Sequence, residues 1–238
     1  MSRLTVLALV LWSLHVTANV EKVIFTAPDA QPKIQDASLD NLFLTTLSES
    51  YPSVRTYINA SFPTNTSTKG TESWFLLDGL VPHRRYEVRI CWAATQPTSF
   101  WLDTYMVNTA FSDASLISSL STYSYLRHDQ LTSKDVQTLK DRQHKHDPNQ
   151  ETTILFLQIF AAADYFSLNQ TLMDVVPPVA IDLILDPYVF NVLPKSLIPT
   201  GLYLGLIGIF AWFASSWILR HLFSNNSSAI IPPSKKVD

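Results

Sequence analysis

Alternation of apolar and polar positions is the dominant pattern of residues 19–196. It is clearest over residues 85–93, where every second side chain is apolar: Tyr86, Val88, Ile90 and Trp92. A period of two places these side chains on one face and predicts a half-buried antiparallel strand. Similar runs predict strands at residues 22–26, 42–47, 55–62, 73–77, 100–107, 152–161 and 181–185. Eight strands separated by Pro and Asn predict a mainly β fold, an antiparallel β-sandwich of the fibronectin or immunoglobulin-like type.

A local motif at the start of the 85–93 run supports the sandwich. Leu80, Pro82, Tyr86 and Val88 have the spacing of a strand entry in fibronectin type III domains. In that motif a tyrosine holds the preceding turn, as in a tyrosine corner. The alternative is an ordinary strand that follows a Pro-containing turn.

Residues 112–151 have a different composition. Their first part is rich in serine, and the part after Arg127 is rich in charge with few aliphatic residues. Such a segment buries little apolar surface. We therefore expect a flexible insertion in the domain, with one short helix from Ser133.

The N-terminal residues have the pattern of a secretory signal peptide. Arg3 is followed by an apolar run over residues 4–14, and small residues precede Asn19. This order predicts a signal peptide over residues 1–18 that is cleaved after Ala18. An uncleaved anchor is the alternative.

A second apolar run, residues 197–219, contains 23 positions without a charge. About 20 apolar residues cross the hydrocarbon core, so this run predicts a transmembrane helix. The basic residues that follow it favour a cytosolic tail over residues 220–238, which places residues 19–196 in the lumen. A signal for a glycosylphosphatidylinositol (GPI) anchor would end in its apolar tail, whereas this run is followed by a largely polar segment.

The tail ends with Lys235, Lys236 and two further residues. Lysines at the third and fourth positions from the end resemble the dilysine retrieval signal of type I membrane proteins, which is recognised by coat proteins. We therefore expect retrieval to the endoplasmic reticulum (ER).

Small residues share one face of the predicted transmembrane helix: Gly201, Gly205, Gly208 and Ser215. The spacing of Gly201 and Gly205 lets helix backbones approach closely, which favours packing against the membrane helices of a partner. Trp212 lies on the same face and interrupts the groove. Glycines that are merely tolerated in a span are the alternative interpretation.

Three sequons lie in the predicted lumenal domain, at Asn59, Asn65 and Asn169. We expect N-glycosylation of at least one of them. The sequons that begin at Asn225 and Asn226 fall in the predicted cytosolic tail.

Composition limits the chemistry of the chain. The net charge of −3 gives no basic field for nucleic acid. Five glycines, three of them in the apolar run 197–219, leave no Rossmann fingerprint or P-loop. Cys91 is the single cysteine, which excludes an internal disulfide framework and a Cys-based zinc site. We expect it to be a half-buried structural thiol.

Other candidate chemical groups have simpler explanations. His144 and His146 lie in an apparent loop, where a solvated polar tract is favoured over a metal site. Nothing in the sequence pairs the acids that lie near apolar runs, which are Asp103, Asp164, Asp182 and Asp186. We therefore expect no catalytic residue, no metal ligand and no cofactor.

Five stretches together resemble a known family: Asn19-Val-Glu-Lys22, Arg55-Thr-Tyr-Ile-Asn-Ala-Ser-Phe62, Tyr86-Glu-Val-Arg-Ile-Cys-Trp-Ala-Ala-Thr-Gln-Pro97, Phe100-Trp-Leu-Asp103 and Asp186-Pro-Tyr-Val-Phe-Asn-Val-Leu-Pro194. The family is the small non-catalytic subunit of the fungal GPI mannosyltransferase II complex. The resemblance covers most of the predicted lumenal segment and the span, except residues 112–151. It rests on the order of the stretches and on the topology, since none of them is a catalytic signature.

The resemblance implies an ER-resident type I protein that pairs with a polytopic mannosyltransferase. That enzyme adds the second mannose to the GPI-anchor precursor from dolichol-phosphate-mannose. This chain would stabilise or position the enzyme without a catalytic residue of its own. Residues 186–194 would then lie just outside the membrane, with Tyr188 and Phe190 in contact with the partner's lumenal loops.

Two other classes remain as alternatives. A cargo receptor of the GOLD-domain type shares the signal, sandwich, span and dilysine tail, but it also carries a lumenal disulfide and a coiled-coil stalk. Here Cys91 has no partner cysteine, and prolines interrupt the segment before the span. A lumenal glycan-processing enzyme would need an acid pair in a cleft.

Overall fold

The computed structural model describes residues 19–29, 39, 41–128, 131–132, 136–137, 139 and 153–226. The chain forms two units, one that ends at Pro194 and one that begins at Lys195, and each is described by itself. The predicted signal peptide with its cleavage site at Ala18 lies outside the described residues, and so do His144, His146, Lys235 and Lys236.

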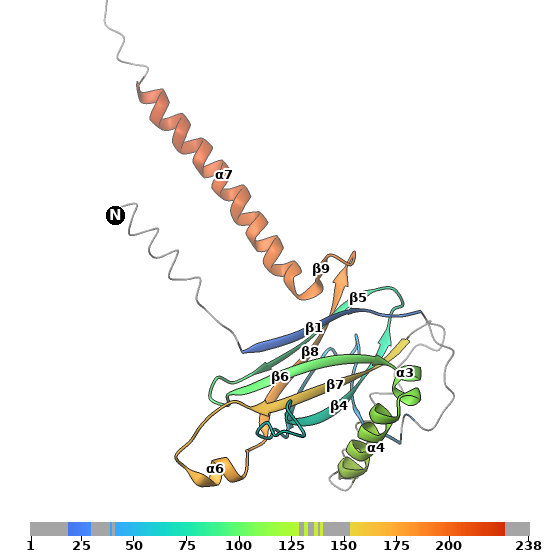
Figure 1. Ribbon diagram of the computed structural model, residues 1–238. Helices are drawn as coiled ribbons and strands as arrows, with labels where there is room; N and C mark the ends of the chain where they lie inside the picture. The colour runs from blue at the N-terminus through green and yellow to red at the C-terminus, as the bar shows by residue number, and fades with distance from the viewer. Residues whose placement is uncertain are drawn as a thin grey trace, which may run out of the picture. The chain divides into compact units, whose positions relative to one another are not determined.

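The first unit contains two β-sheets (Figure 1). In the first sheet the strand order is β1-β5-β8-β3, with every neighbour antiparallel, and the short β9 pairs with the end of β8. Its strands are β1 (Val20–Thr26), β3 (Ser53–Ile58), β5 (Arg85–Trp92), β8 (Val179–Val189) and β9 (Leu193–Pro194).

The second sheet has the order β2-β4-β7-β6. Its strands are β2 (Thr45–Leu47), β4 (Thr71–Leu80), β6 (Thr98–Met106) and β7 (Thr153–Ala163). The pairs β4–β7 and β6–β7 are antiparallel, whereas β2 runs parallel to β4. This parallel pair departs from the fully antiparallel sandwich that the sequence predicts.

A shared core joins the two sheets. Alternate residues of β5 and β8 pack against alternate residues of β4 and β7, and all of them are buried: Val88, Ile90, Leu183, Leu185, Phe75, Leu77, Leu157 and Ile159. Their removal from water is the main favourable contribution to folding. The prediction of a mainly β fold with two packed sheets is confirmed.

Two helices cover the other face of the second sheet, α3 (Val107–Ser112) and α4 (Ala114–His128) (Figure 1). A second core lies between them and the sheet, built from Trp74, Leu76 and Phe156 of the strands and Val107, Ala110 and Leu120 of the helices. The indole Nε1 of Trp74 also donates a hydrogen bond to Ser119 Oγ, 3.0 Å away. The strands β4 and β7 are therefore buried on both faces.

The position of α4 corrects the prediction of a flexible insertion over residues 112–151. Leu116, Leu120 and Tyr123 follow helical spacing and pack toward the second core. Polar residues of the helix hold it as well, because Arg127 donates to the carbonyl oxygen of Phe43, and Ser124 donates to that of Leu42. Residues 112–128 are thus a packed layer of the domain. Most of the rest, including most of the predicted helix from Ser133, lies outside the described residues.

The strand predictions agree with the structure in number and place, with two changes. The predicted strand 55–62 pairs within the first sheet only as far as Ile58. The chain then crosses to the second sheet, where Ser61 forms a parallel bridge with Ala162 of β7. The two-residue strand β9 was not predicted, because it is defined by pairing rather than by alternation.

The predicted tyrosine clamp is present at the start of β5. Tyr86 is fully buried, and its hydroxyl oxygen accepts a hydrogen bond from the backbone N–H of Val81, 2.9 Å away. The same hydroxyl donates to the carboxylate of Glu49, which also pairs with Arg84. Burial and the bond to Glu49 raise the pKa of Tyr86 well above its usual range, so the phenol stays protonated.

The second unit consists of a short 3-10 helix, η2 (Lys195–Leu197), and the long helix α7 (Ile198–Asn226). The most apolar 18-residue stretch within Lys195–His221 has a mean hydropathy of 1.8, and α7 is about 43 Å long at 1.5 Å per residue. This helix is long and apolar enough to cross a membrane, as predicted for residues 197–219.

Replacement Tyr86→Phe should destabilise the domain by about 2–3 kcal/mol. It removes one hydrogen bond to a carboxylate and leaves the Val81 N–H without its partner. We expect a melting temperature about 5–10 °C lower for the detergent-solubilised chain, followed by tryptophan fluorescence. Tyr57→Phe is the matched control, because Tyr57 is 70% exposed on the first sheet. Equal stability of the two variants would show that the clamp contributes nothing.

Candidate functional site

The hairpin formed by β8 and β9 is the part of the first unit that directly precedes α7 in sequence. Val189 pairs with Leu193, and the backbone N–H of Val192 donates to the carbonyl oxygen of Val189, 3.1 Å away. Between them, Phe190 and Asn191 both have positive φ, 52° and 58°. Asn adopts this conformation readily, whereas it strains a bulky Phe, so Phe190 is not a residue that the turn itself requires.

Polar contacts hold the hairpin against the start of β5. The side chain of Asn191 accepts from the backbone N–H of Arg85, 2.9 Å away, and donates to the carbonyl oxygen of His83, 3.0 Å away. Arg84 Nε donates to the carbonyl oxygen of Tyr188. The turn therefore has a fixed geometry on the domain.

The two predicted contact residues of the hairpin, Tyr188 and Phe190, differ strongly in solvent exposure. Phe190 is 93% exposed, and its neighbour Val192 is 78% exposed. Tyr188 is only 6% exposed, because its hydroxyl donates to Glu87 and the Arg85 guanidinium lies over its ring. The Tyr188 side chain is therefore part of the sheet and offers little surface to a partner, and its contact with a partner stays a prediction. Phe190 is placed as expected for a contact residue.

An acid pair lies beside Tyr188 on the outer face of the first sheet. Glu87 and Asp186 are direct partners on β5 and β8, and both are buried. The guanidinium of Arg89 bridges them, with Nε 3.2 Å from Glu87 and Nη2 3.2 Å from Asp186, and Lys22 adds a second cation at 3.3 Å from Glu87. The sequence did not identify Glu87 as a candidate, because the partner of a strand residue follows only from the register. Both carboxylates are neutralised by cations, so the pair resembles a structural charge cluster rather than an acid–base site.

The four acids singled out from the sequence are not brought together. Each has a different partner: Lys69 for Asp103, Ser99 for Asp164, Arg55 for Asp182 and Arg89 for Asp186. The two hydrogen bonds from Arg55 lower the pKa of Asp182 below its usual range. Among the described residues, no group of three His, Cys, Asp or Glu side chains is arranged to hold a metal ion.

Cys91 lies on β5 opposite Asp182 of β8 and is half-buried. Burial raises the pKa of its thiol, which lowers the share of reactive thiolate. This environment matches the expected structural thiol.

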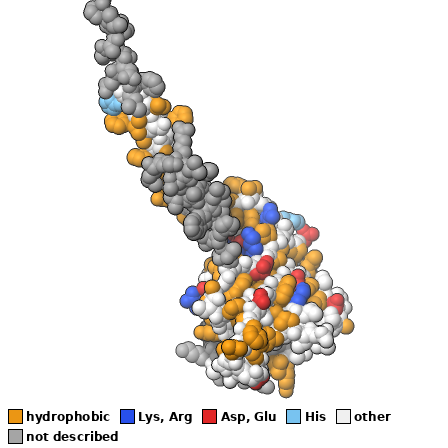
Figure 2. Space-filling model, turned by 60° about the vertical axis from the view of Figure 1, so that its left-hand side comes forward, with side chains coloured by type: hydrophobic (Ala, Val, Ile, Leu, Met, Phe, Trp, Pro, Cys, Tyr) orange, Lys and Arg blue, Asp and Glu red, His pale blue; other side chains and the backbone are white. Residues whose placement is uncertain are grey.

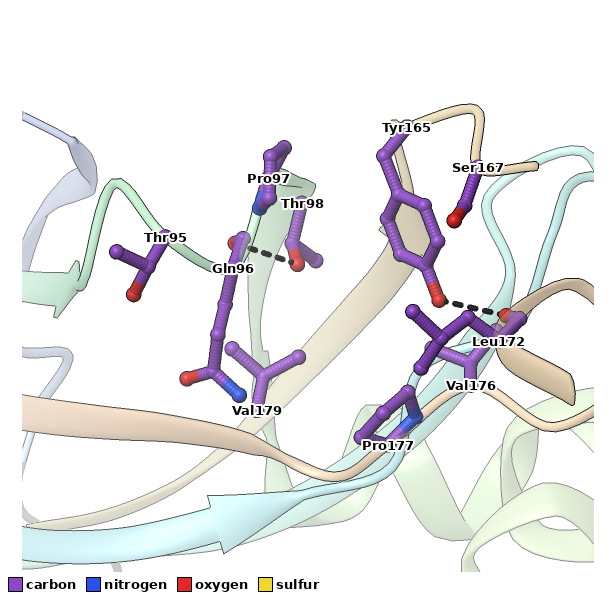
Figure 3. A pocket seen from close by; sticks show the side chains of 10 residues that line it. All are labelled: Thr95, Gln96, Pro97, Thr98, Tyr165, Ser167, Leu172, Val176, Pro177 and Val179. Atoms are coloured by element: carbon purple, nitrogen blue, oxygen red, sulfur yellow. Dashed lines mark hydrogen bonds between the residues drawn. The ribbon is translucent and has the colours of Figure 1, made fainter. Parts of the chain in front are cut away.

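A pocket of about 280 Å³ lies between the turn that joins β5 to β6 and the segment that joins β7 to β8 (Figure 3). That segment contains the short helix α6 (Gln170–Asp174). Gln96 crosses the boundary, donating to the carbonyl oxygen of Pro178 and accepting from the backbone N–H of Ala180. The lining consists of hydroxyl and apolar side chains and the amide of Gln96, without a charged group: Thr95, Gln96, Pro97, Thr98, Tyr165, Ser167, Leu172, Val176, Pro177 and Val179. It offers apolar contacts but no acid, base or nucleophile activated by one.

The side chains of α7 leave its small-residue face open. A Cβ atom added at Gly201, Gly205 or Gly208 would meet no heavy atom within 4 Å, apart from its sequence neighbours and the helix backbone. Ser215 is also exposed. Among the described residues of the second unit, none packs against this face of α7.

The three sequon asparagines, Asn59, Asn65 and Asn169, are all exposed.

Figure 2 shows acidic and basic side chains scattered among apolar ones on the visible face of the domain. That face has no broad area of one charge sign.

Replacement Arg89→Met should test the charge cluster. It leaves two buried carboxylates side by side and should cost about 3 kcal/mol at neutral pH. Arg55→Met is the control, because the pair of Arg55 with Asp182 is exposed and should leave the melting temperature nearly unchanged. An Arg89 variant as stable as this control would contradict the bridging role.

Comparison with known proteins places these features in a family. No curated protein and no solved structure gives a significant match. A family model described as GPI-mannosyltransferase II co-activator, Pga1, matches residues 9–159. The match spans the chain from the predicted signal peptide into β7, including α4, and it covers more than half of the sequence. The chain therefore belongs to the family of GPI-mannosyltransferase II co-activators.

Proposed function

We propose that this chain is a non-catalytic subunit of GPI mannosyltransferase II, held in the ER membrane with its β-domain in the lumen. It stabilises or positions the polytopic enzyme that adds the second mannose to the GPI-anchor precursor. Family membership supports the co-activator role. In the subunit role, the chain would act on its enzyme through direct contacts of the β8–β9 hairpin and of α7.

The β8–β9 hairpin carries the proposal. Its tip presents Phe190 and Val192 to solvent on a turn that Asn191 fixes in place. A preorganised apolar anchor of this kind is a typical centre of a protein interface, because little entropy is lost when it binds. Only Lys195–Leu197 separate β9 from α7, so the hairpin is within a few residues of the proposed span.

The open face of α7 supplies a second contact in the membrane. Between helices in lipid, close backbone approach at small residues replaces the hydrophobic effect as the source of affinity. Gly201 and Gly205 have the spacing for such an approach. The partner is a polytopic protein in this proposal, so it has membrane helices to offer.

The proposed orientation and location rest on the patterns predicted near both ends of the sequence. A signal peptide over residues 1–18 would deliver residues 19–196 to the lumen. Lys235 and Lys236 in a cytosolic tail would be recognised by coat proteins and return the chain to the ER. The enzyme would then keep its subunit in the compartment in which the precursor is mannosylated.

Depletion of the protein in its host tests the proposed step. Radiolabelled mannose should accumulate in the GPI precursor with one mannose, because the second transfer is impaired. Return of the full-length chain should restore later precursors. Normal precursors together with delayed export of finished GPI proteins would overturn the proposal and indicate a cargo receptor instead.

Co-purification of the catalytic subunit tests the two contacts. Phe190→Ser should lower the recovered enzyme about tenfold, the effect of losing one apolar anchor. Gly205→Leu should also lower it, because a large side chain keeps the helix backbones apart.

Each variant has a matched control. Tyr125→Ser removes a similarly exposed aromatic side chain from α4, and Ala214→Leu enlarges a small residue on the opposite face of α7. Both controls should retain the enzyme at the wild-type level. Full recovery with Phe190→Ser would eliminate the hairpin as the contact.

A further inference from the structure

A cluster of exposed apolar side chains lies at the other end of β8 from the hairpin. It belongs to the segment between β7 and β8 and comprises Phe166, Leu168, Leu172 and Val175, which are 82%, 95%, 36% and 68% exposed. We call this cluster the α6 patch. Four exposed apolar side chains within ten residues of one segment favour an occupant of this surface.

Contacts of Tyr165 hold the segment that carries the α6 patch. Tyr165 and Ser167 line the pocket of Figure 3, where the Tyr165 hydroxyl donates to the carbonyl oxygen of Leu172, 2.8 Å away. The Tyr165 ring also packs edge-on against Phe62. The alternate residues Phe166 and Leu168 are strongly exposed. Phe166 and Leu168 are therefore exposed on a segment that hydrogen bonds and ring contacts hold against the domain.

Asn169 lies within the α6 patch in sequence, directly after Leu168. It caps α6, because its Oδ1 accepts from the backbone N–H of Thr171, 3.1 Å away. Its Nδ2 atom makes no hydrogen bond to a described residue, and the residue is exposed. Asn169, Gln170 and Thr171 form a sequon, so the nitrogen that would be glycosylated is free and presented by a fixed cap.

We propose that an N-linked glycan on Asn169 is the occupant of the α6 patch, with its first N-acetylglucosamine packed on the ring of Phe166. The inference rests on the lumenal placement proposed above. A lipid-diphosphate oligosaccharide is the donor. Asn169 Nδ2 forms the bond to sugar carbon C1, the bond from C1 to the diphosphate oxygen breaks, and one proton leaves Nδ2 as the lipid diphosphate departs.

The geometry of the chain allows this contact. Asn169 follows Phe166 by three positions, so their Cα atoms are at most about 11 Å apart. N-acetylglucosamine has one face made of C–H groups, and this face packs well on an aromatic ring. Covering Phe166 and Leu168 removes apolar surface from water while the sugar hydroxyls remain solvated.

Asn65 provides an internal comparison. It is exposed like Asn169, but its neighbours Thr64, Thr66 and Ser67 are polar and exposed. Phe62 stands at the same spacing before Asn65, but it is half-buried and its ring packs against Tyr165, so it offers a glycan on Asn65 less apolar surface than Phe166 offers. Glycosylation of Asn65 therefore tests whether the domain is lumenal, but it does not test the contact between a glycan and Phe166.

The test uses full-length protein made in a eukaryotic host and purified in detergent. Peptide mass spectrometry after enzymatic deglycosylation, which converts glycosylated Asn to Asp, gives the occupancy at each sequon. Thr171→Val removes the sequon hydroxyl but leaves the cap from the Thr171 N–H to Asn169 intact. Thr171→Ser is its matched control, because it keeps the sequon.

We expect an occupied Asn169 in the wild type and with Thr171→Ser. Thr171→Val should lower the melting temperature by about 2–4 °C, the shift produced by losing a small apolar contact in a domain of this size. In a Phe166→Ser background the same replacement should have no effect, because the glycan has lost its surface. Phe166 is exposed, so its replacement should not prevent folding.

Two results would overturn the inference. One is an empty Asn169 in a chain whose Asn65 or Asn59 is glycosylated, which leaves the lumenal placement standing. The other is an equal effect of Thr171→Val with and without Phe166. If all three sequons are empty, the lumenal placement fails together with this inference.

Discussion

The pairing of β8 along both of its edges is the constraint on which the proposed functions depend. β8 bonds to β5 on one side and to β3 on the other, and its inward residues Leu183 and Leu185 form part of the shared core. A strand held in this way has a fixed register, because a slip by one residue would turn its apolar face to water. Its two ends are therefore fixed as well: one carries the hairpin before α7, and the other carries the α6 patch.

The charge cluster on the outer face reinforces the same register. Glu87 and Asp186 face each other only in the observed pairing, and Arg89 bridges both of them. Two buried carboxylates without that cation would repel each other strongly. The cluster thus penalises other registers of β5 and β8, and it also holds Tyr188 directly before the hairpin turn. Carboxylates committed in this way do not serve as an acid and a base.

The sequence predicts the strands well because alternation records which side of a strand is buried, as in residues 85–93. It fails for α4, whose serine-rich sequence has the composition of a loop although Leu120 and Ser124 are buried. A signal for the helical layer was present in β7, because the unbroken apolar run from Ile154 to Leu157 needs cover on both faces. The burial of Tyr188 and the pairing of Glu87 with Asp186 depend on contacts between distant segments, which no local pattern encodes.

The two proposed contacts lie on one short linker, which would let a small chain hold a large membrane enzyme. Only residues 195–200 separate the hairpin from Gly201 on the open face of α7, so binding of one would confine the other to a small volume. The second contact then forms at a high effective concentration, and the combined affinity exceeds that of either contact. Because the linker is short, only a partner with a lumenal surface directly above its membrane helices can engage both. This requirement favours a polytopic enzyme over a soluble cargo protein as the proposed partner.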